Sequence, residues 1–426
     1  MKRNLLSVAA LLFGTLFLFM GNGLQGILLP VRGNLEGYAT TTLGLLGTSW
    51  AGGFVIGCLI APKIVRRVGH VRAFSGFISI IAIIALVSGI IIDPVWWVVL
   101  RAVTGFSTAG TSMIIESWLN ERASNESRGA IFSLYIGITL LGVVGGQMMI
   151  PLEDVRTPVL FMICGIFYCI AMLPTTLSTA ASPQPLKAVR LDLPALYRNS
   201  PVSCLGILLV GIANGAYGTL GAGLSDTNIA VMMSATIFAG AVMQLPAGRL
   251  SDRIDRRYVL AAMSGIAALA GLLIFLFHPT SPALLIGLVV LYGAVANTLY
   301  PIAVAHANDF AASEDFVKVS GGLLLLYGIG TMIGPTLSGP VMSAITPHAL
   351  FLVTAIAHVL ITVYAIIRSR IRAAVPASDR DAYTTIPTGT SQMLTPQSMS
   401  LADRGAGKPP ETEKSPESGD PAVKFG

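Results

Sequence analysis

Long apolar runs recur along the whole chain, and they constrain its fold more than any other feature. Each run is about 20 residues long, the length that a helix needs to cross roughly 30 Å of hydrocarbon. The runs are continuously apolar rather than alternating, so they predict helices and not the strands of a membrane barrel. Twelve such segments can be placed, near 5–29, 42–62, 72–92, 95–118, 130–150, 158–177, 204–224, 229–248, 258–277, 283–305, 317–340 and 348–369.

The composition supports an integral membrane protein. Hydrophobic residues make up 54% of the chain and charged residues only 11%, whereas about a quarter of the residues of a soluble globular protein are charged. Lys and Arg gather in the loops of one predicted side, while the loops of the other side contain only Arg32 and Arg156. Basic loops stay in the cytoplasm, so we expect a multi-pass protein of the cytoplasmic (plasma) membrane with both termini cytoplasmic. This topology accounts for the net charge of +6, and the lipid bilayer rather than nucleic acid is the expected partner.

One sequence pattern occurs twice in the chain. The string Asn-Gly-Leu-Gln-Gly at 22–26 returns as Asn-Gly-Ala-Tyr-Gly at 214–218, which is 192 positions later. Residues 135–142 and 327–334 form another similar pair at the same offset. An internal duplication of about six apolar segments per copy predicts two pseudo-symmetric six-helix bundles, the arrangement of transporters built from parallel repeats.

The chain is predicted to divide into four parts. An N-terminal bundle at 1–177 and a C-terminal bundle at 204–371 are joined by a polar cytoplasmic linker at 178–203. The remainder, 372–426, is rich in Ser, Thr, Pro, Gly and acidic residues. Such a segment cannot bury enough surface to fold alone, so we expect a disordered cytoplasmic tail. The alternative is a regulatory segment that docks a cytoplasmic partner.

The loop between the eighth and ninth segments carries the most specific motif. Residues 248–257 read Gly-Arg-Leu-Ser-Asp-Arg-Ile-Asp-Arg-Arg, which resembles the G-x-L-x-D-R-x-G-R-R signature of the major facilitator superfamily. With twelve segments, two halves and a central linker, the resemblance covers residues 1 to about 370. It implies the major facilitator fold, an all-α membrane protein with twelve transmembrane helices in two six-helix bundles.

The resemblance also implies a cytoplasmic gate, because in the family this loop is thought to stabilise the outward-facing conformation. An acidic residue at a helix terminus can make charge-assisted contacts with fixed cations and so hold the ends of the two bundles together. The first copy of the loop departs from the signature, with Arg66 at the acidic position. Charges that only set the topology are the alternative there. The predicted gate residues are Asp252, Arg253, Arg256, Arg257, Arg66 and Arg67.

The fourth segment contains Arg101, which begins an R-x-x-x-G string at 101–105. This string resembles the family's fourth-helix motif, whose arginine is associated with proton coupling. An arginine inside an apolar helix is costly unless it is paired or faces water, so it is a functional candidate. The alternative is that Arg101 snorkels to the outer interface near Asp93.

The same segment ends with Glu-Ser-Trp-Leu-Asn at 116–120, and Arg-Gly follows at 128–129. This combination looks like the bacterial YcaD-like branch of the superfamily. Glu116 is predicted to be a protonatable carboxylate at the inner edge of the cavity and, with Arg101, to take part in proton coupling. A structural ion pair with Arg122 or Arg128 is the alternative.

The repeated motif supplies the first candidates for substrate contact, Asn22, Gln25, Asn214 and Tyr217. They lie at mid-helix, and the family places their two helices around the central cavity. Their amide and phenol groups can bind a neutral ligand through hydrogen bonds. Close helix packing is the competing interpretation, because glycines flank these residues and a polar neighbour can bond across such a contact. Further predicted substrate contacts are Gln147, Gln244, Asn297, Tyr300 and Tyr327.

We therefore expect a monomeric secondary active transporter, not an enzyme, that moves a small neutral or amphipathic organic solute by alternating access. The sequence contains no Walker motif, and its Cys and His residues are not spaced for metal, so neither a cofactor nor a metal is expected. Glycines and prolines at 328–340 resemble a motif that antiporters of the family carry in their fifth helix, which implies efflux, with protons as the candidate coupling ion. The alternatives are a lysolipid or lipid translocator and a membrane receptor or scaffold that acts through 372–426.

Overall fold

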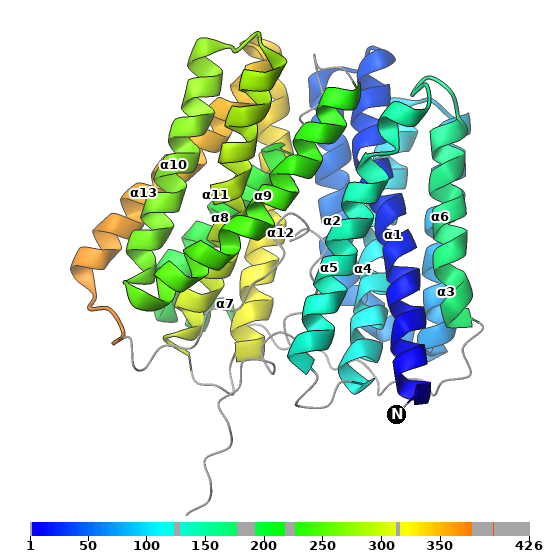
Figure 1. The fold of residues 1–426 in the computed structure, drawn as a ribbon, viewed down its shortest axis with the longest axis horizontal. Coiled ribbons are helices and arrows are strands. Elements are labelled where there is room, and N and C mark those ends of the chain that lie inside the picture. The colour runs from blue at the N-terminus through cyan, green and yellow to red at the C-terminus, as the bar shows by residue number, and fades with distance from the viewer. Residues whose placement is uncertain are drawn as a thin grey trace, which may run out of the picture.

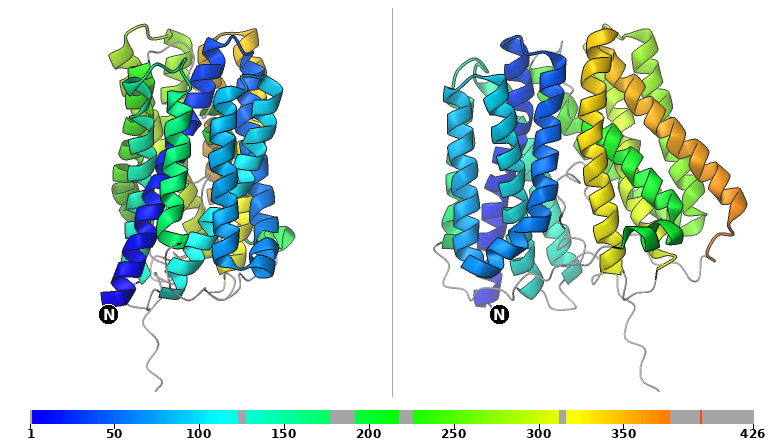
Figure 2. Two further views of the ribbon diagram at one scale, coloured as in Figure 1. Left: turned by 90° about the vertical axis from the view of Figure 1, so that its right-hand side faces the viewer. Right: turned by 180° about the vertical axis from the view of Figure 1, so that it is seen from behind.

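A computed structural model describes residues 2–122, 128–176, 192–217, 226–311, 316–376 and 395, and these ranges contain helices and no strand. The helices stand in two groups side by side (Figures 1 and 2). We call the end of the molecule that carries the N-terminus the terminal face, and the opposite end the distal face.

The first group holds the helices up to residue 176. They are α1 (Lys2–Leu35), α2 (Thr40–Val68), α3 (His70–Ile90), α4 (Pro94–Arg122), α5 (Arg128–Gln147), the short 3-10 helix η1 (Ile150–Leu152) and α6 (Val159–Thr176).

The second group begins inside the predicted linker (178–203), of which 178–191 lies outside the described residues. Its helices are α7 (Leu193–Asn199), α8 (Pro201–Tyr217), α9 (Asp226–Arg253), α10 (Arg256–Phe277), α11 (Pro282–Asn308), α12 (Phe316–Ala344), the 3-10 helix η3 (Pro347–Ala349) and α13 (Leu350–Ile371). Of the predicted tail, only 372–376 and Thr395 are described.

Eleven described helices are long and apolar enough to cross a membrane, and α7 with α8 makes a twelfth if this pair is counted as one span. The predicted all-α membrane fold is thereby confirmed. The segment predicted at 204–224 differs most, because α8 ends at Tyr217 and the following positions to 225 are not described. The bend of 112° between α7 and α8 falls at Ser200, which has an extended backbone. Pro201 follows it, and a residue before proline is disfavoured in the helical conformation.

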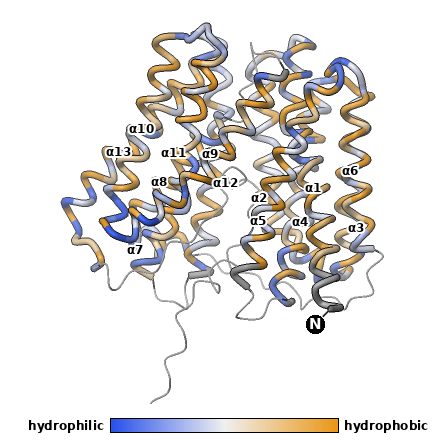
Figure 3. The backbone as a smooth tube through the Cα atoms, in the orientation of Figure 1, coloured by the Kyte–Doolittle hydropathy of each residue, from blue (hydrophilic) through white to orange (hydrophobic). Residues whose placement is uncertain are grey.

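Apolar side chains cover both the inside and the outside of each group. Figure 3 shows hydrophobic colour along the helices and hydrophilic colour mainly toward their ends. Ile83, Phe238 and Leu269 are all more than half exposed. A soluble protein would not expose so many large apolar residues, whereas lipid is as apolar as these side chains.

The same helix pairs form in both groups. In the first group α1 packs on α5, α2 on α4, and α3 on α6. In the second group α8 packs on α12, α9 on α11, and α10 on α13. Each helix therefore has a counterpart at the same place in the other group, which makes the two six-helix bundles pseudo-symmetric, as the sequence duplication predicted.

Glycine allows the closest of these contacts. At the crossing of α2 and α4, a Cβ added to Gly53 or Gly105 would overlap the backbone of the other helix. Gly23 meets the backbone of Val143 on α5, and its repeat partner Gly215 meets the backbone of Thr331 on α12. The repeated Asn-Gly motif therefore places a packing glycine at the same crossing in both bundles.

The bundles touch each other along α2 and α12 in the distal half. Thr40 Oγ1 donates to the carbonyl of Gly339 (3.1 Å), and Thr48 Oγ1 donates to that of Met332 (2.9 Å). Helices α5 and α9 form the symmetry-related contact, where Ser234 Oγ donates to Gln147 Oε1 (3.1 Å). We call these two contacts the distal seam.

We predict that Gly105→Ala lowers the stability of the purified protein. The new methyl group would meet the carbonyl of Trp50, so α4 must move away from α2. Overpacking of this kind costs about 1–3 kcal/mol. The measurement is the melting temperature in detergent.

Gly137→Ala is the matched control, because Gly137 is exposed on α5 and a Cβ there meets nothing within 4 Å. It should leave the melting temperature unchanged or raise it slightly, since alanine favours helix. Equal melting temperatures for the two variants would show that the α2–α4 crossing does not depend on glycine.

Candidate functional site

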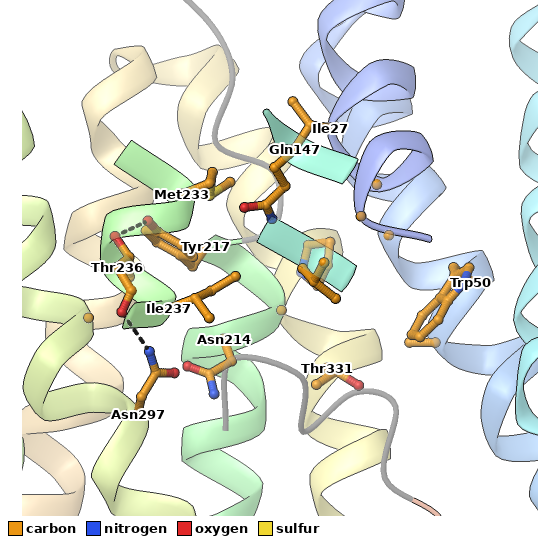
Figure 4. Close-up of a pocket in the computed structure, with 18 of the residues that line it drawn as sticks. Ile27, Trp50, Gln147, Asn214, Tyr217, Met233, Thr236, Ile237, Asn297 and Thr331 are labelled. Atoms are coloured by element: carbon orange, nitrogen blue, oxygen red, sulfur yellow. Dashed lines mark hydrogen bonds between the residues drawn. The ribbon is translucent and has the colours of Figure 1, made fainter. Parts of the chain in front are cut away.

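A cavity of about 190 Å³ lies between the two bundles (Figure 4). Four helices of the first bundle (α1, α2, α4 and α5) and four of the second (α8, α9, α11 and α12) contribute to its wall. The polar and aromatic residues among those lining it are Asn22, Trp50, Arg101, Gln147, Asn214, Tyr217, Thr236, Tyr292, Asn297, Tyr327 and Thr331.

Six of the nine predicted substrate contacts line this cavity. They come from both bundles and from five different helices. The six are Asn22, Gln147, Asn214, Tyr217, Asn297 and Tyr327.

The remaining three, Gln25, Gln244 and Tyr300, are buried and are not among the described lining residues. Gln25 lies on the α6 side of α1, where its Oε1 accepts a hydrogen bond from the Tyr168 hydroxyl (3.2 Å). Tyr300 packs edge-on against the ring of Tyr327, with centroids 5.1 Å apart. A mid-helix polar residue can face the bundle interior instead of the cavity, and the short sequence motif does not distinguish these two faces.

Asn22 and Asn214 occupy related places on opposite sides of the cavity. Asn22 Oδ1 accepts a hydrogen bond from Tyr168 of α6 (3.1 Å), and Asn214 Nδ2 donates to the hydroxyl of Tyr327 on α12 (3.2 Å). Their glycine neighbours, Gly23 and Gly215, make the close helix contacts. The two interpretations of the motif are therefore compatible, because the asparagines line the cavity and Gly23 and Gly215 both line it and pack the helices.

The second bundle contributes a network of hydroxyl and aromatic groups. The Tyr217 hydroxyl and Thr236 Oγ1 are 3.1 Å apart, and Asn297 Nδ2 donates to the Thr236 carbonyl (3.4 Å) (Figure 4). The rings of Tyr217 and Tyr292 stack with centroids 5.8 Å apart. This wall can offer both hydrogen bonds and an aromatic surface to a ligand.

Four of the polar and aromatic lining residues were not predicted from the sequence: Trp50, Thr236, Tyr292 and Thr331. Threonine and aromatic residues are common in helix packing, so their presence alone indicates no site. Thr331 could have been predicted to line the cavity, since it follows the predicted Tyr327 by four positions and therefore lies on the same helix face.

Arg101 lines the cavity from α4. Its Cζ lies 5.8 Å from the centroid of the Trp50 ring, within the range of a cation–π contact. Asp93, the partner expected if Arg101 snorkelled outward, instead accepts the backbone N–H groups of Val95 and Trp96 at the start of α4 (2.9 and 3.0 Å). The structure therefore places Arg101 at the cavity.

Glu116, the other predicted coupling residue, is buried nearer the terminal face and is not among the described lining residues. Its Oε1 accepts a hydrogen bond from the Tyr135 hydroxyl (2.9 Å), and its Oε2 accepts one from Thr395 of the tail. The side chains of Arg122 and Arg128, its alternative partners, lie outside the described residues. Fifteen helical residues separate Glu116 from Arg101, or roughly 22 Å at 1.5 Å per residue, so the two do not form a pair.

Three predicted gate residues of the second bundle, Asp252, Arg256 and Arg257, form ion pairs within that bundle. Arg256 binds Asp309 through Nε (2.8 Å) and Asp252 through Nη1 (3.2 Å). Arg257 binds Asp255 through Nη2 (2.7 Å). These pairs tie the ends of α9, α10 and α11 together within one bundle.

The remaining gate residues, Arg66, Arg67 and Arg253, are exposed at the terminal face. Their predicted role in joining the ends of the two bundles stays a prediction, because the described ion pairs of Arg256 and Arg257 do not cross between the bundles.

Hydrogen bonds to Asp255 stabilise the loop between α9 and α10. Burial alone would raise the pKa of Asp255, but hydrogen bonds from the side chain and the backbone N–H of Arg257 outweigh burial and hold that pKa below its usual value. Asp255 also caps α10 through the N–H of Arg257 (3.0 Å). Its ionised form therefore favours the native loop at neutral pH.

Residues 200–402 match the family model described as Major Facilitator Superfamily. The chain is 28% identical over 357 residues to an uncharacterized MFS-type transporter of Enterobacter sp., and 26% identical over 358 residues to the uncharacterized MFS-type transporter YcaD of Escherichia fergusonii. Both alignments cover 82% of this chain and 92% of the relative.

Two solved structures have a similar fold. The nucleoside transporter NupG superposes with a TM-score of 0.71 at 15% identity, covering 85% of this chain and 98% of that one. A bacterial homolog to the human lysosomal transporter Spinster gives a TM-score of 0.67 at 16% identity, covering 88% of this chain and 97% of that one. At these identities the likeness is one of fold.

We predict that Asp309→Asn destabilises the second bundle. The side chains of Arg256 and Asp309 are both buried, and Asp309→Asn leaves Arg256 paired with the more exposed carboxylate of Asp252. Removing one partner of a buried ion pair costs roughly 3–5 kcal/mol when the other charge is left uncompensated, so the remaining Asp252 pair should hold the loss at or below the lower end of that range. The measurement is the melting temperature at pH 7.5. Arg253→Gln, which changes an exposed charge of the same loop, should shift the melting temperature little. If the two variants melt alike, the buried pair does not stabilise the bundle.

Proposed function

We propose that this chain, which belongs to the major facilitator superfamily, carries a small polar or amphipathic organic solute across the cytoplasmic membrane by alternating access. Proteins of this architecture bind their substrate between two halves that rock about a fixed site. The chain is a transporter and not an enzyme, since its sequence relatives and its structural neighbours are transporters.

One observation carries the proposal: the cavity is built equally from both bundles, with a repeat-related asparagine on each side. Asn22 comes from α1 and Asn214 from the corresponding helix α8. A solute bound to both would contact both halves, so movement of one half against the other would change its access to the two sides.

The contacts between the bundles support a cavity that opens alternately to the distal face and to the terminal face. The distal seam closes the bundles against each other at Thr40, Thr48 and Gln147. At the terminal face the ion pairs of Arg256 and Arg257 stay within the second bundle. Because this face carries the basic loops, we propose that it is cytoplasmic and that both termini lie there.

Glu116 is our candidate for proton coupling. It is a buried carboxyl group in the membrane-spanning part of α4, and such groups mark proton pathways by default. Its Tyr135 partner can donate to the ionised form and can stay hydrogen-bonded to the protonated form. Efflux driven by proton entry is the direction that the glycine-proline motif of α12 favours.

A lipid translocator and a receptor or scaffold are the two alternatives to solute transport. A lipid or lysolipid translocator needs a largely apolar passage, whereas amide and hydroxyl groups face this cavity from both bundles. A receptor or scaffold would act through the tail, whose described residue Thr395 contacts Glu116.

We predict that Asn22→Ala and Asn214→Ala each weaken solute binding by about 10–100-fold, the loss of one or two buried hydrogen bonds. The measurement is the rise in melting temperature with sugars, amino acids, organic acids, drugs and lysolipids, followed by counterflow of each stabilising compound in proteoliposomes. Asn34→Ala is the control, because Asn34 is exposed at the distal end of α1.

A polar solute that stabilises the wild type and the Asn34→Ala variant but neither cavity variant supports the proposal. Stabilisation by lysolipids alone, unaffected by both cavity substitutions, would instead favour the lipid translocator. If no compound of the panel binds or exchanges, the cavity does not serve the transport of a small polar solute.

A further inference from the structure

Arg101 is the one charged residue among the described residues that line the cavity. Its Nε is buried and has no hydrogen-bond partner among the described residues, and none of the ion pairs found there includes Arg101. The titratable groups that interact with it are the Tyr168 phenol and the Cys164 thiol of α6. Neither group is ionised at neutral pH in its ordinary range, so the described residues supply no anion to balance this guanidinium.

Arg32 is a buried arginine that stabilises the fold, and its partners can be compared with the surroundings of Arg101. It is also buried, but its Nε binds the carboxylate of Glu36 (2.6 Å) and its Nη1 donates to the carbonyl of Val155 (2.9 Å). Arg32 thus ties α1 to the loop before α6. Within the described part of the chain Arg101 has no equivalent partners, which separates it from the arginines that stabilise the fold.

The acidic residues nearest to Arg101 in the sequence, Asp93 and Glu116, have other partners. Asp93 caps the start of α4 through its Oδ1. Glu116 lies about four helical turns toward the terminal face and binds Tyr135. An uncompensated cation in a membrane protein is costly and is usually retained for a ligand or an ion.

The surroundings of Arg101 are suited to an anion. The face of the Trp50 ring fixes the position of the guanidinium, which leaves its planar edge for a bidentate contact with a carboxylate. Asn22, on the same side of the cavity, has an Nδ2 group that is buried without a hydrogen-bond partner. This side of the cavity therefore presents N–H donors that the described protein leaves unused.

The opposite side is suited to the remainder of an organic molecule. The stacked rings of Tyr217 and Tyr292 and the side chains of Met233 and Ile237 form an apolar surface there. The Asn214 and Asn297 amides and the Thr236, Tyr327 and Thr331 hydroxyls are the polar groups beside it. A ligand that spans the cavity would put charge on the first bundle and an apolar or aromatic body on the second.

We infer that the transported solute is a small organic monoanion whose carboxylate binds Arg101 and whose apolar or aromatic body lies against the second bundle. This inference rests on the proposed function and narrows its substrate class. It also changes the role expected for Arg101, which becomes a substrate-binding residue and not a proton carrier, while Glu116 keeps the coupling role.

The test compares carboxylates with their own uncharged amides on the full-length protein at pH 7.5. The pairs are benzoate and benzamide, phenylacetate and phenylacetamide, and hexanoate and hexanamide. Sodium chloride and inorganic phosphate at the same concentrations distinguish an organic carboxylate from a bare inorganic anion. The measurements are the melting temperature as a function of concentration and counterflow in proteoliposomes.

We expect at least one carboxylate to stabilise the protein and to exchange, with its amide bound roughly tenfold more weakly or worse. Arg101→Gln should lose this difference, and Arg101→Lys should keep part of it because lysine keeps the charge but not the planar fork. Without ligand, Arg101→Gln should melt at the same or a higher temperature than the wild type, since it removes an uncompensated cation. The matched control Arg32→Gln should melt lower and keep the preference for carboxylates.

Several results would overturn the inference. The inference fails if the amides bind with the same affinity as their carboxylates. It also fails if chloride or phosphate raises the melting temperature as much as every carboxylate does. A ligand-free Arg101→Gln protein that melts as low as Arg32→Gln would show that Arg101 is a structural residue. A neutral solute whose binding depends on Asn22 and Asn214 would leave the proposed function standing and reject the anion, whereas no binding by any compound would count against both.

Discussion

Pairs of helices in this protein approach one another so closely at glycine that backbone meets backbone, and the remaining structure depends on this contact. Lipid gives apolar side chains no reason to leave it, so membrane helices associate through tight packing rather than through hydrophobic burial. Gly53 and Gly105 join α2 to α4, while Gly23 and Gly215 join α1 to α5 and α8 to α12. These crossings fix the positions of the helices whose next residues, such as Asn22 and Asn214, form the cavity wall.

Most of the fold could be predicted from the sequence because the bilayer imposes a simple rule. A helix must present about 20 apolar residues to cross it, and every described membrane helix carries such a run. The ends were less predictable. Polar residues continue the helix beyond the hydrocarbon, as at Arg253 of α9, and the break before Pro201 separates α7 from α8.

The site could be predicted only in part, for a reason of geometry. The duplication identified the depth of Asn22 and Asn214 but not which side of a helix faces the cavity. Gln25 was expected to line the cavity with Asn22, yet both bond Tyr168 and only Asn22 is among the described lining residues. Residues brought in by other helices, such as Trp50 and Thr236, have no signal in the local sequence. Arg101 was recognised as exceptional because a charge in an apolar helix needs a partner, yet only the packing shows that no described residue forms an ion pair with it.

The hydrogen bonds of the distal seam allow α2 and α12 to separate at a small cost in free energy. The carbonyl oxygens that accept Thr40 and Thr48 each have a second hydroxyl donor on their own helix: Ser343 donates to Gly339 (3.1 Å), and Thr336 donates to Met332 (3.0 Å). If α2 left α12, neither acceptor carbonyl would lose its last hydroxyl donor, and the freed Thr48 could donate to a carbonyl one turn back in α2. The contact between α2 and α12 can therefore open and close reversibly, because the accepting carbonyls of α12 keep a hydrogen bond in both states.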